Sequence, residues 1–252
     1  ESAGVAAELS ERHDAPSMSL EQVLADDAID AVTIATPAVT HGQLSIRCLE
    51  HGKHVFVEKP MAVDVAEAQL VADRAAALNK RLMVGHLLQY HAAFLRLREL
   101  VDAGAIGALR YVYSNRLSFG QIRNEENSLW SFAPHDISMI LSLMGEAPRA
   151  VSAVGAAFVQ SHLADVTTTH MDFSGGRHAH VFVSWLHPYK EQRLVVVGEE
   201  GMLEFNDQND WPEKVKLYPH QVDFTGEMPI ALKAEAKPVD VAAVEPLLEE
   251  MR

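Results

Sequence analysis

The sequence is poor in residues that form covalent or metal cross-links. It has one cysteine, Cys48, and contains neither a CxxC nor an HExxH motif. One thiol excludes an internal disulfide and is typical of a reducing cytoplasm. Without paired-ligand spacings the 13 histidines predict no dedicated metal site, and His178 with His180 on one predicted strand is better explained as a polar sheet face. We therefore expect a cytoplasmic protein without a metal.

Basic residues and long apolar runs are also scarce. Lys and Arg number 21 against 35 Asp and Glu, which gives a formal charge of −14. A net negative field repels nucleic acid and anionic membranes. No stretch approaches the roughly 18 consecutive apolar residues that predict a transmembrane helix, and the first residues lack the regions of a signal peptide. Neither nucleic acid nor a membrane is therefore an expected partner.

The first part of the sequence alternates short apolar strands with helices. Strands are predicted at residues 31–35, 53–57 and 82–84, and helices at 40–50 and from 64 onward. Strands separated by helices of 10 to 15 residues predict βαβ units. Residues 1–104 are therefore predicted to form part of an α/β domain with a doubly wound parallel sheet.

From Leu109 onward the apolar residues alternate with a period of two. One helix, predicted at 134–144, interrupts the strands, and Gly175-Gly176 predicts a hairpin turn. Consecutive strands with short turns predict an antiparallel sheet. Residues 105–252 are therefore predicted to be an α+β domain with a large open antiparallel sheet. Its predicted strands span 109–117, 150–159, 167–173, 178–185, 192–197, 202–205 and about 215–218.

Two segments follow predicted parallel strands, where ligands of doubly wound sheets bind. In segment 35–41 the helix amides and the Thr36 hydroxyl can face a phosphate or a ribose, and a simple capped turn is the alternative. Glu58-Lys59-Pro60 follows the next strand, and Pro60 allows a cis peptide. A partly desolvated Lys59 can bind a substrate hydroxyl and help to remove its proton, whereas a surface ion pair with Glu58 is the alternative.

A third candidate is His135, which follows Pro134 directly. Proline suits the first turn of a helix, so His135 is predicted at the amino end of helix 134–144. The helix dipole there favours a neutral imidazole, which can accept a proton from an alcohol. A capping or core histidine is the alternative.

The order of these motifs resembles the Gfo/Idh/MocA family, named after glucose–fructose oxidoreductase, inositol dehydrogenase and MocA. The resemblance runs from Val5 to about Tyr218. It implies the remainder of a Rossmann domain whose first strand and GxGxxG turn precede Glu1, and both ends of the sequence are expected to be cuts through a longer chain. The motifs that carry it are Ala35-Thr36-Pro37 with His41, Glu58-Lys59-Pro60, Val84-Gly85-His86 and Pro134-His135-Asp136.

The resemblance also implies residue roles. Lys59 matches the family lysine that contacts nicotinamide and the substrate hydroxyl, and His135 matches the acid–base histidine. Ser131 stands where many members carry Asp, and Gln89-Tyr90 replaces an Arg-Phe pair. The implied cofactor is NAD or NADP, and the residues expected to bind it are Thr36, Pro37, His41, Glu58, Lys59, Pro60 and His86.

Segment 115–127, which leads into Leu129-Trp130, is most similar to family members that act on nucleotide-linked sugars, such as UDP-N-acetylglucosaminuronate 3-dehydrogenases. Arg116 and Arg123 can hold a carboxylate or a diphosphate. The alternative for Arg123 is a solvated charge against Glu125 and Glu126. The residues expected to bind substrate are Lys59, Tyr90, Arg116, Arg123, Trp130, His135 and Asp136.

The expected function is therefore NAD(P)-dependent oxidation of a secondary alcohol on a sugar, with a nucleotide sugar as the first choice. A free-polyol or inositol-type dehydrogenase is the alternative enzyme, and a non-catalytic dinucleotide-binding regulator is the alternative of another class. The antiparallel sheet has more strands than helix 134–144 can cover. Because its other face is expected to bear Phe182 and Trp185, a homodimer or homotetramer formed through this face is predicted.

Overall fold

The computed structural model describes residues 3–124, 126–223 and 225–251, which divide into two compact units. The first unit ends at Gly85 and the second begins at His86. Sequence analysis put the division after residue 104. It falls earlier because helix α5 (Ala92–Asp102) buries Phe94 and Leu97 completely in the core of the second unit.

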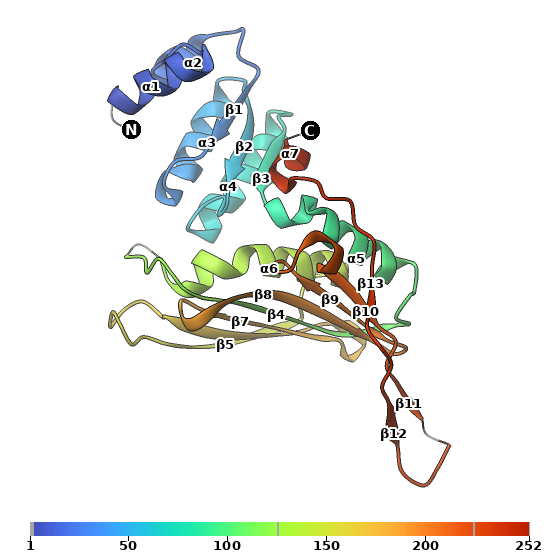
Figure 1. Cartoon of the computed structure of the whole chain (residues 1–252). Helices are drawn as coiled ribbons and strands as arrows, with labels where there is room; N and C mark the ends of the chain where they lie inside the picture. Colours follow the sequence, from blue (N-terminus) through green and yellow to red (C-terminus); the bar gives the residue numbers. More distant parts are fainter. Residues whose placement is uncertain (1–2, 125, 224, 252) are drawn as a thin grey trace. The chain divides into compact units, whose positions relative to one another are not determined.

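The first unit confirms the predicted βαβ pattern. Its three strands are parallel and lie in the order β1-β2-β3, and each predicted strand agrees with an observed one to within a residue (Figure 1). The elements are α1 (Ala3–His13), α2 (Leu20–Ala25), β1 (Ala31–Ile34), η1 (Ala38–Thr40), α3 (His41–Glu50), β2 (His54–Glu58), α4 (Val65–Ala77) and β3 (Leu82–Gly85).

Local side-chain caps set where helices of this unit begin. Ser19 and Gln22 form a capping box at α2, and the Asp64 carboxylate accepts a hydrogen bond from the Glu67 amide at the start of α4 (3.0 Å). Apolar side chains of the strands then pack against α3 and α4. The buried core of the unit consists of Leu24, Ile34, Cys48, Leu49, Val55, Val57, Val71 and Ala75.

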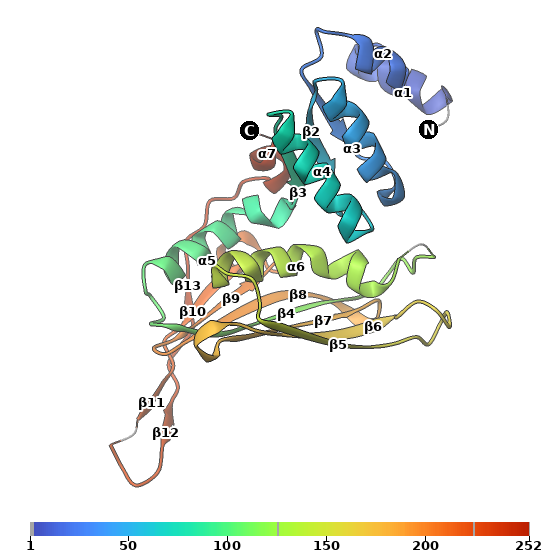
Figure 2. The same ribbon diagram turned by 180° about the vertical axis from the view of Figure 1, so that it is seen from behind.

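The second unit is an eight-stranded sheet in the order β13-β10-β9-β8-β4-β7-β6-β5, and α5 and α6 lie along one face of it (Figure 2). Its elements are η2 (Leu87–Tyr90), α5, β4 (Leu109–Phe119), α6 (Ser128–Met144), β5 (Ala150–Ala156), β6 (Val166–Asp172), η3 (Ser174–Gly176), β7 (His178–Ser184), β8 (Leu186–Gly198), β9 (Met202–Asn206), η4 (Trp211–Glu213), β10 (Val215–Tyr218), β11 (Gln221–Asp223), β12 (Ile230–Leu232), β13 (Lys237–Pro238) and α7 (Pro246–Glu250).

The large sheet differs from the antiparallel prediction at one pair of strands. β4 and β7 run parallel, whereas the other neighbouring strands of this sheet run antiparallel. Helix α6 and strands β5 and β6 intervene between β4 and β7, so the chain crosses over before β7 pairs with β4. The predicted hairpin turn at Gly175-Gly176 is confirmed, and both glycines have positive φ angles of 68° and 72°.

Helix α6 begins six residues earlier than predicted. Asn127 is its N-cap, and the Asn127 carboxamide oxygen accepts a hydrogen bond from the Trp130 amide (3.1 Å). Pro134 therefore lies inside the helix, where it can donate no amide hydrogen to the Trp130 carbonyl. His135 is seven residues beyond Ser128. The dipole argument for a neutral His135 is thus wrong, because the effect is confined to the first turn.

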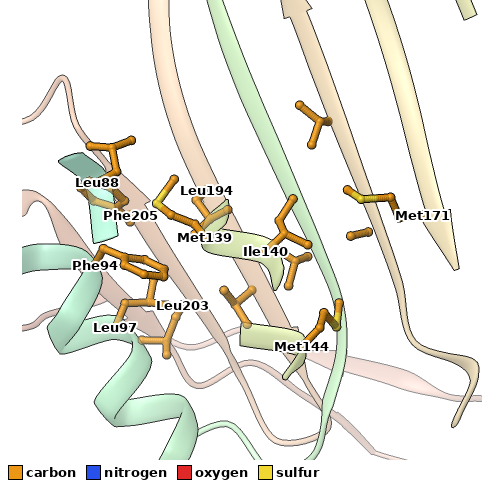
Figure 3. Close-up of a cluster of buried hydrophobic side chains, with 14 of the residues drawn as sticks. Leu88, Phe94, Leu97, Met139, Ile140, Met144, Met171, Leu194, Leu203 and Phe205 are labelled. Atoms are coloured by element: carbon orange, nitrogen blue, oxygen red, sulfur yellow. The ribbon is translucent and has the colours of Figure 1, made fainter. Parts of the chain in front are cut away.

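The core of the second unit lies between the sheet and helices α5 and α6 (Figure 3). Phe94 and Leu97 of α5 and Ile140 of α6 are completely buried there. Trp185 is also completely buried, so its predicted place on the exposed face is wrong. It continues the alternation of the inward-facing Val181 and Val183.

Among residues 3–124, 126–223 and 225–251, no helix combines the length and apolar character needed to cross a membrane.

Candidate active site

The first unit brings the ends of its parallel strands together at one edge. Ile34, Val57 and Val84 stand in register across β1, β2 and β3. The chain therefore leaves this edge three times, through Thr36-Pro37, Lys59-Pro60 and His86. This is the edge at which doubly wound sheets bind ligands, and it carries the segments that were predicted to follow parallel strands.

A chain of hydroxyl hydrogen bonds orders the segment after β1. The Thr40 hydroxyl donates to the Pro37 carbonyl oxygen (2.7 Å), so its oxygen can accept the hydrogen of the Thr36 hydroxyl, 2.7 Å away. The exposed Thr36 oxygen then has only acceptor capacity left for a ligand. This arrangement suits a ribose hydroxyl better than a phosphate oxygen, which itself needs a donor.

His41 links the segment after β1 with the segment after β2. Its Nε2 lies 2.7 Å from the Thr36 carbonyl oxygen and its Nδ1 lies 2.7 Å from the Pro60 carbonyl oxygen. The side chain is only 1% exposed. His41 was predicted to contact the cofactor, but both ring nitrogens are engaged by backbone carbonyls. Its role in the structure is to position Thr36 and the Lys59-Pro60 segment.

Glu58 and Lys59 stand at the end of β2, and both side chains are half-buried. The Lys59-Pro60 peptide bond is cis. The Glu58 carboxylate lies beside Gly85, the residue paired with it on β3, and a Cβ on Gly85 would stand only 3.1 Å from a Glu58 oxygen. Gly85 thus leaves room for a carboxylate next to the lysine.

These residues fit the nicotinamide-ribose end of NAD. Thr36 and Glu58 offer acceptors for ribose hydroxyls or a carboxamide, and Lys59 offers a cationic donor. The residues that can hold the cofactor are therefore Thr36, Glu58 and Lys59, while Pro37, His41 and Pro60 shape the loops that carry them.

In the second unit, His86 lies next to His135. Their ring centroids are 6.0 Å apart and the rings are nearly perpendicular, at 85°. A hydrogen bond from Gln89 to the Ser138 hydroxyl (3.2 Å) holds η2 against α6, and Ser138 in turn donates to the His135 carbonyl oxygen (2.7 Å). His135 is half-buried, and Ser131 lies one helical turn before it on the same face.

Arg116 and Asp136 pair with each other. Arg116 Nε donates to Asp136 Oδ2 (2.6 Å) and Nη2 donates to Oδ1 (3.3 Å), and the Ser114 hydroxyl donates to Oδ1 (2.5 Å). The Asp136 side chain is 2% exposed and that of Arg116 is 12% exposed. Both were predicted to bind substrate. The structure instead makes them a buried ion pair that anchors α6, and with it His135, to β4.

Of the other predicted substrate residues, Arg123 and Trp130 lie close to the start of α6, and Tyr90 lies in η2. Arg123 forms an ion pair with Glu126 (3.2 Å), as its alternative interpretation proposed, whereas Glu125 lies outside the described residues. The Trp130 side chain, in the first turn of α6, is 44% exposed. Tyr90 is half-buried in η2. These side chains stay predicted contacts.

A loop after β5 supports the segment that precedes α6, and sequence analysis missed it. Gln160 donates to the Arg123 carbonyl oxygen (3.1 Å), and the Ser128 amide donates to the Ala164 carbonyl oxygen (2.9 Å). The buried Asp165 carboxylate holds this loop by accepting from the Phe158 and Val159 amides and from Trp185. Burial opposes its ionisation, but the three hydrogen bonds outweigh burial and lower the pKa of Asp165.

The two units together have the architecture of a dinucleotide-binding oxidoreductase: a parallel sheet with ligand-binding strand ends, followed by a large sheet covered on one face by helices. Residues 2–86 match the description "Oxidoreductase family, NAD-binding Rossmann fold", and residues 94–204 match "GFO/IDH/MocA C-terminal domain". The chain belongs to the Gfo/Idh/MocA family, and its first unit is an NAD-binding Rossmann domain.

Individual relatives act on sugars and polyols. UDP-N-acetylglucosamine 3-dehydrogenase of Acidithiobacillus ferrooxidans is 33% identical over 167 residues, which are 66% of this chain and 51% of that protein. The scyllo-inositol 2-dehydrogenase (NAD(+)) of Bacillus subtilis is 28% identical over 193 residues, 72% of this chain and 56% of that protein.

A solved structure gives a fuller match. UDP-N-acetylglucosamine 3-dehydrogenase GnnA from A. ferrooxidans has a TM-score of 0.84 and 27% identity, covering 100% of this chain and 77% of that chain. The chain spans about half the length of the curated relatives that it matches.

Proposed function

We propose that the protein oxidises a secondary alcohol of a sugar with NAD, and that Lys59 and His135 serve the proton transfer. The observation that carries the proposal is the placement of Lys59 beside Glu58 at the carboxyl end of a strand in an NAD-binding Rossmann domain. NAD, when bound, supplies the hydride acceptor. The protein supplies position and removes the hydroxyl proton.

Lys59 is suited to the proton transfer by its chemistry and its support. A half-buried ammonium is a compact cationic donor that can bind a hydroxyl oxygen. His41 fixes the Pro60 carbonyl, and therefore the backbone next to Lys59. His135 is the second candidate, held on α6 by the Arg116–Asp136 pair one residue along the helix.

For the substrate we propose a nucleotide sugar that is oxidised at its 3-hydroxyl. The similarity to UDP-N-acetylglucosamine 3-dehydrogenase supports this class, and an inositol-type polyol is the alternative supported by scyllo-inositol 2-dehydrogenase. Arg123 is the proposed contact for the diphosphate or a sugar carboxylate, because its side chain is 44% exposed whereas Arg116 is committed to Asp136.

The experiment that tests this function follows NADH formation with UDP-N-acetylglucosamine, UDP-N-acetylglucosaminuronate, scyllo-inositol and myo-inositol. We expect turnover with a UDP sugar. Lys59→Ala should lower kcat at least about 100-fold, since positioned acid–base groups contribute about 10²–10⁴-fold. His135→Ala should cost a similar factor if it is the base, and about tenfold if Lys59 is.

The matched control is Lys80→Ala, a half-buried lysine two residues before β3, at the amino ends of the strands. Its kcat should equal that of the unmodified protein. Turnover of the inositols but of neither UDP sugar would contradict the proposed nucleotide-sugar substrate and favour an inositol-type polyol. NADH binding without turnover of any alcohol would favour the non-catalytic regulator.

We also propose that the protein forms a dimer or tetramer through the sheet face opposite α5 and α6. Phe182, Tyr111 and Tyr113 lie on this face, and none of them is completely buried. Phe182→Glu should therefore lower the mass measured by light scattering to that of one chain. Val65→Glu, at a site 81% exposed in the first unit, is the control and should leave the mass unchanged. A single-chain mass for the unmodified protein would contradict the proposal.

A further inference from the structure

Two histidines and an aspartate meet on the sheet face that points away from α6. His170 and Asp172 are two residues apart on β6, and His178 is paired directly with Asp172 on β7. The intervening Met171 and Ala179 are buried in the core, so the three polar side chains lie on the opposite face. Each of them is about half exposed, at 46%, 46% and 51%.

The two imidazoles converge on one carboxylate oxygen. His170 Nε2 lies 3.1 Å and His178 Nδ1 lies 2.8 Å from Asp172 Oδ1, and the two rings stack with their centroids 5.4 Å apart. A set of one ligand atom from each residue lies within 4.8 Å of one another. Three atoms this close can surround one ion with only small side-chain rotations, since zinc bonds to nitrogen and oxygen are about 2.0–2.2 Å long.

The donor set selects the class of ion. Imidazole suits zinc, copper and nickel, whereas magnesium and calcium prefer sites made of oxygen atoms alone.

We propose that His170, Asp172 and His178 bind a divalent transition-metal ion, with water completing its coordination. The ion ties the end of β6 to the start of β7 across the η3 turn. Sequence analysis predicted no metal site and paired His178 with His180 instead. His180 is directed elsewhere, because its ring stacks on Tyr113 at 5.4 Å and takes no part in the three-residue cluster.

The test uses the whole chain, treated with a chelator and then dialysed against zinc. We expect one zinc ion per chain, and an increase in Tm of several degrees when zinc is well above its Kd. His170→Ala combined with His178→Ala should weaken zinc binding at least tenfold and remove the zinc-dependent increase in Tm. Asp172→Asn should weaken binding while it preserves the size of the side chain.

The matched control is His180→Ala, a histidine on the same strand and face, which should keep the zinc binding and the Tm increase. Because none of the three ligands belongs to the buried core of the unit, the variants should unfold at nearly the same temperature as the unmodified protein without zinc. The proposal is overturned if the unmodified protein takes up no zinc, or if the double variant takes up as much as the unmodified protein. In that case the cluster is only a polar sheet face.

Discussion

At the scale of single residues, His41 connects the sequence motifs of the first unit. It is buried, and both of its ring nitrogens face carbonyl oxygens, one from each strand-end segment. His41 thereby holds Thr36 and the segment after Lys59 at a fixed separation. A cofactor or substrate that contacts both segments would need that separation to be constant.

We predict that His41→Ala lowers both stability and affinity for NADH. The two part-buried hydrogen bonds to the Thr36 and Pro60 carbonyl oxygens are lost, which costs about 0.5–1.5 kcal/mol each in the free energy of unfolding. Urea unfolding and a fluorescence titration with NADH measure the two effects. His51→Ala is the control, because His51 is exposed at the end of α3 and its loss should change stability by less than about 0.5 kcal/mol. Equal effects of both variants would contradict the linking role.

At the scale of elements, the start of α5 is held against the sheet by a polar cluster. The His91 Nδ1 accepts the Ala93 amide as an N-cap, so Nε2 carries the hydrogen that faces Asp207, 3.4 Å away. His91 stacks on Trp211, with centroids 5.1 Å apart, and Lys214 donates to Asp207 (2.8 Å). Burial opposes ionisation of Asp207, but hydrogen bonds from His91 and Lys214 outweigh it and lower the pKa of Asp207 to about 2.

This pKa predicts a stability contribution that depends on pH. Asp207 ionises more readily in the folded chain than in the unfolded chain. Its contribution to the free energy of unfolding is therefore present above pH 4 and is lost as the pH falls from about 4 towards 2. Asp207→Asn should lower the free energy of unfolding by about 2 kcal/mol at pH 7, and the difference from the unmodified protein should shrink below pH 4. Urea unfolding across this range measures it. Asp210→Asn, in the same loop but exposed, should show no such difference.

At the scale of the whole molecule, the chain consists of two units that each bury their own core. Helix α5 belongs with the large sheet, although its place in the sequence follows the parallel strands directly. Its side chains Phe94 and Leu97 are completely buried against that sheet. The boundary between the units therefore decides which segments can fold alone.

We predict that residues 86–252 fold alone and that residues 105–252 do not. Truncation at 105 removes Leu88, Phe94 and Leu97 from one core, and each large buried side chain contributes about 2–5 kcal/mol. The sum reaches the roughly 5–15 kcal/mol that stabilise a typical protein. Near-ultraviolet circular dichroism and cooperative urea unfolding distinguish the two segments. Cooperative unfolding of 105–252 at the same midpoint would place the boundary at 104 instead.

Much of the fold could be predicted from local patterns. The parallel strands, the helix that begins after Asp64 and the turn at Gly175-Gly176 follow from periodicity and turn chemistry within a few residues. The start of α6 was missed because Pro134 is typical of a first turn, while the N-cap that decides the start is Asn127. The N-cap signal of Asn127 was present in the sequence, but the first-turn signal of Pro134 was given more weight.

The sequence by itself determined the α/β class, the alternation of strands and helices in the first unit and the motif that places Lys59 at a strand end. Only the tertiary structure decided that His41 joins two loops and that Arg116 forms an ion pair with Asp136. It also decided that β4 and β7 run parallel and that His178 lies beside His170 and Asp172. Each of these depends on residues that are distant in the sequence or on opposite strands. Helix and strand periods are encoded within a few positions, whereas register, crossover and side-chain pairing are fixed only when the elements pack.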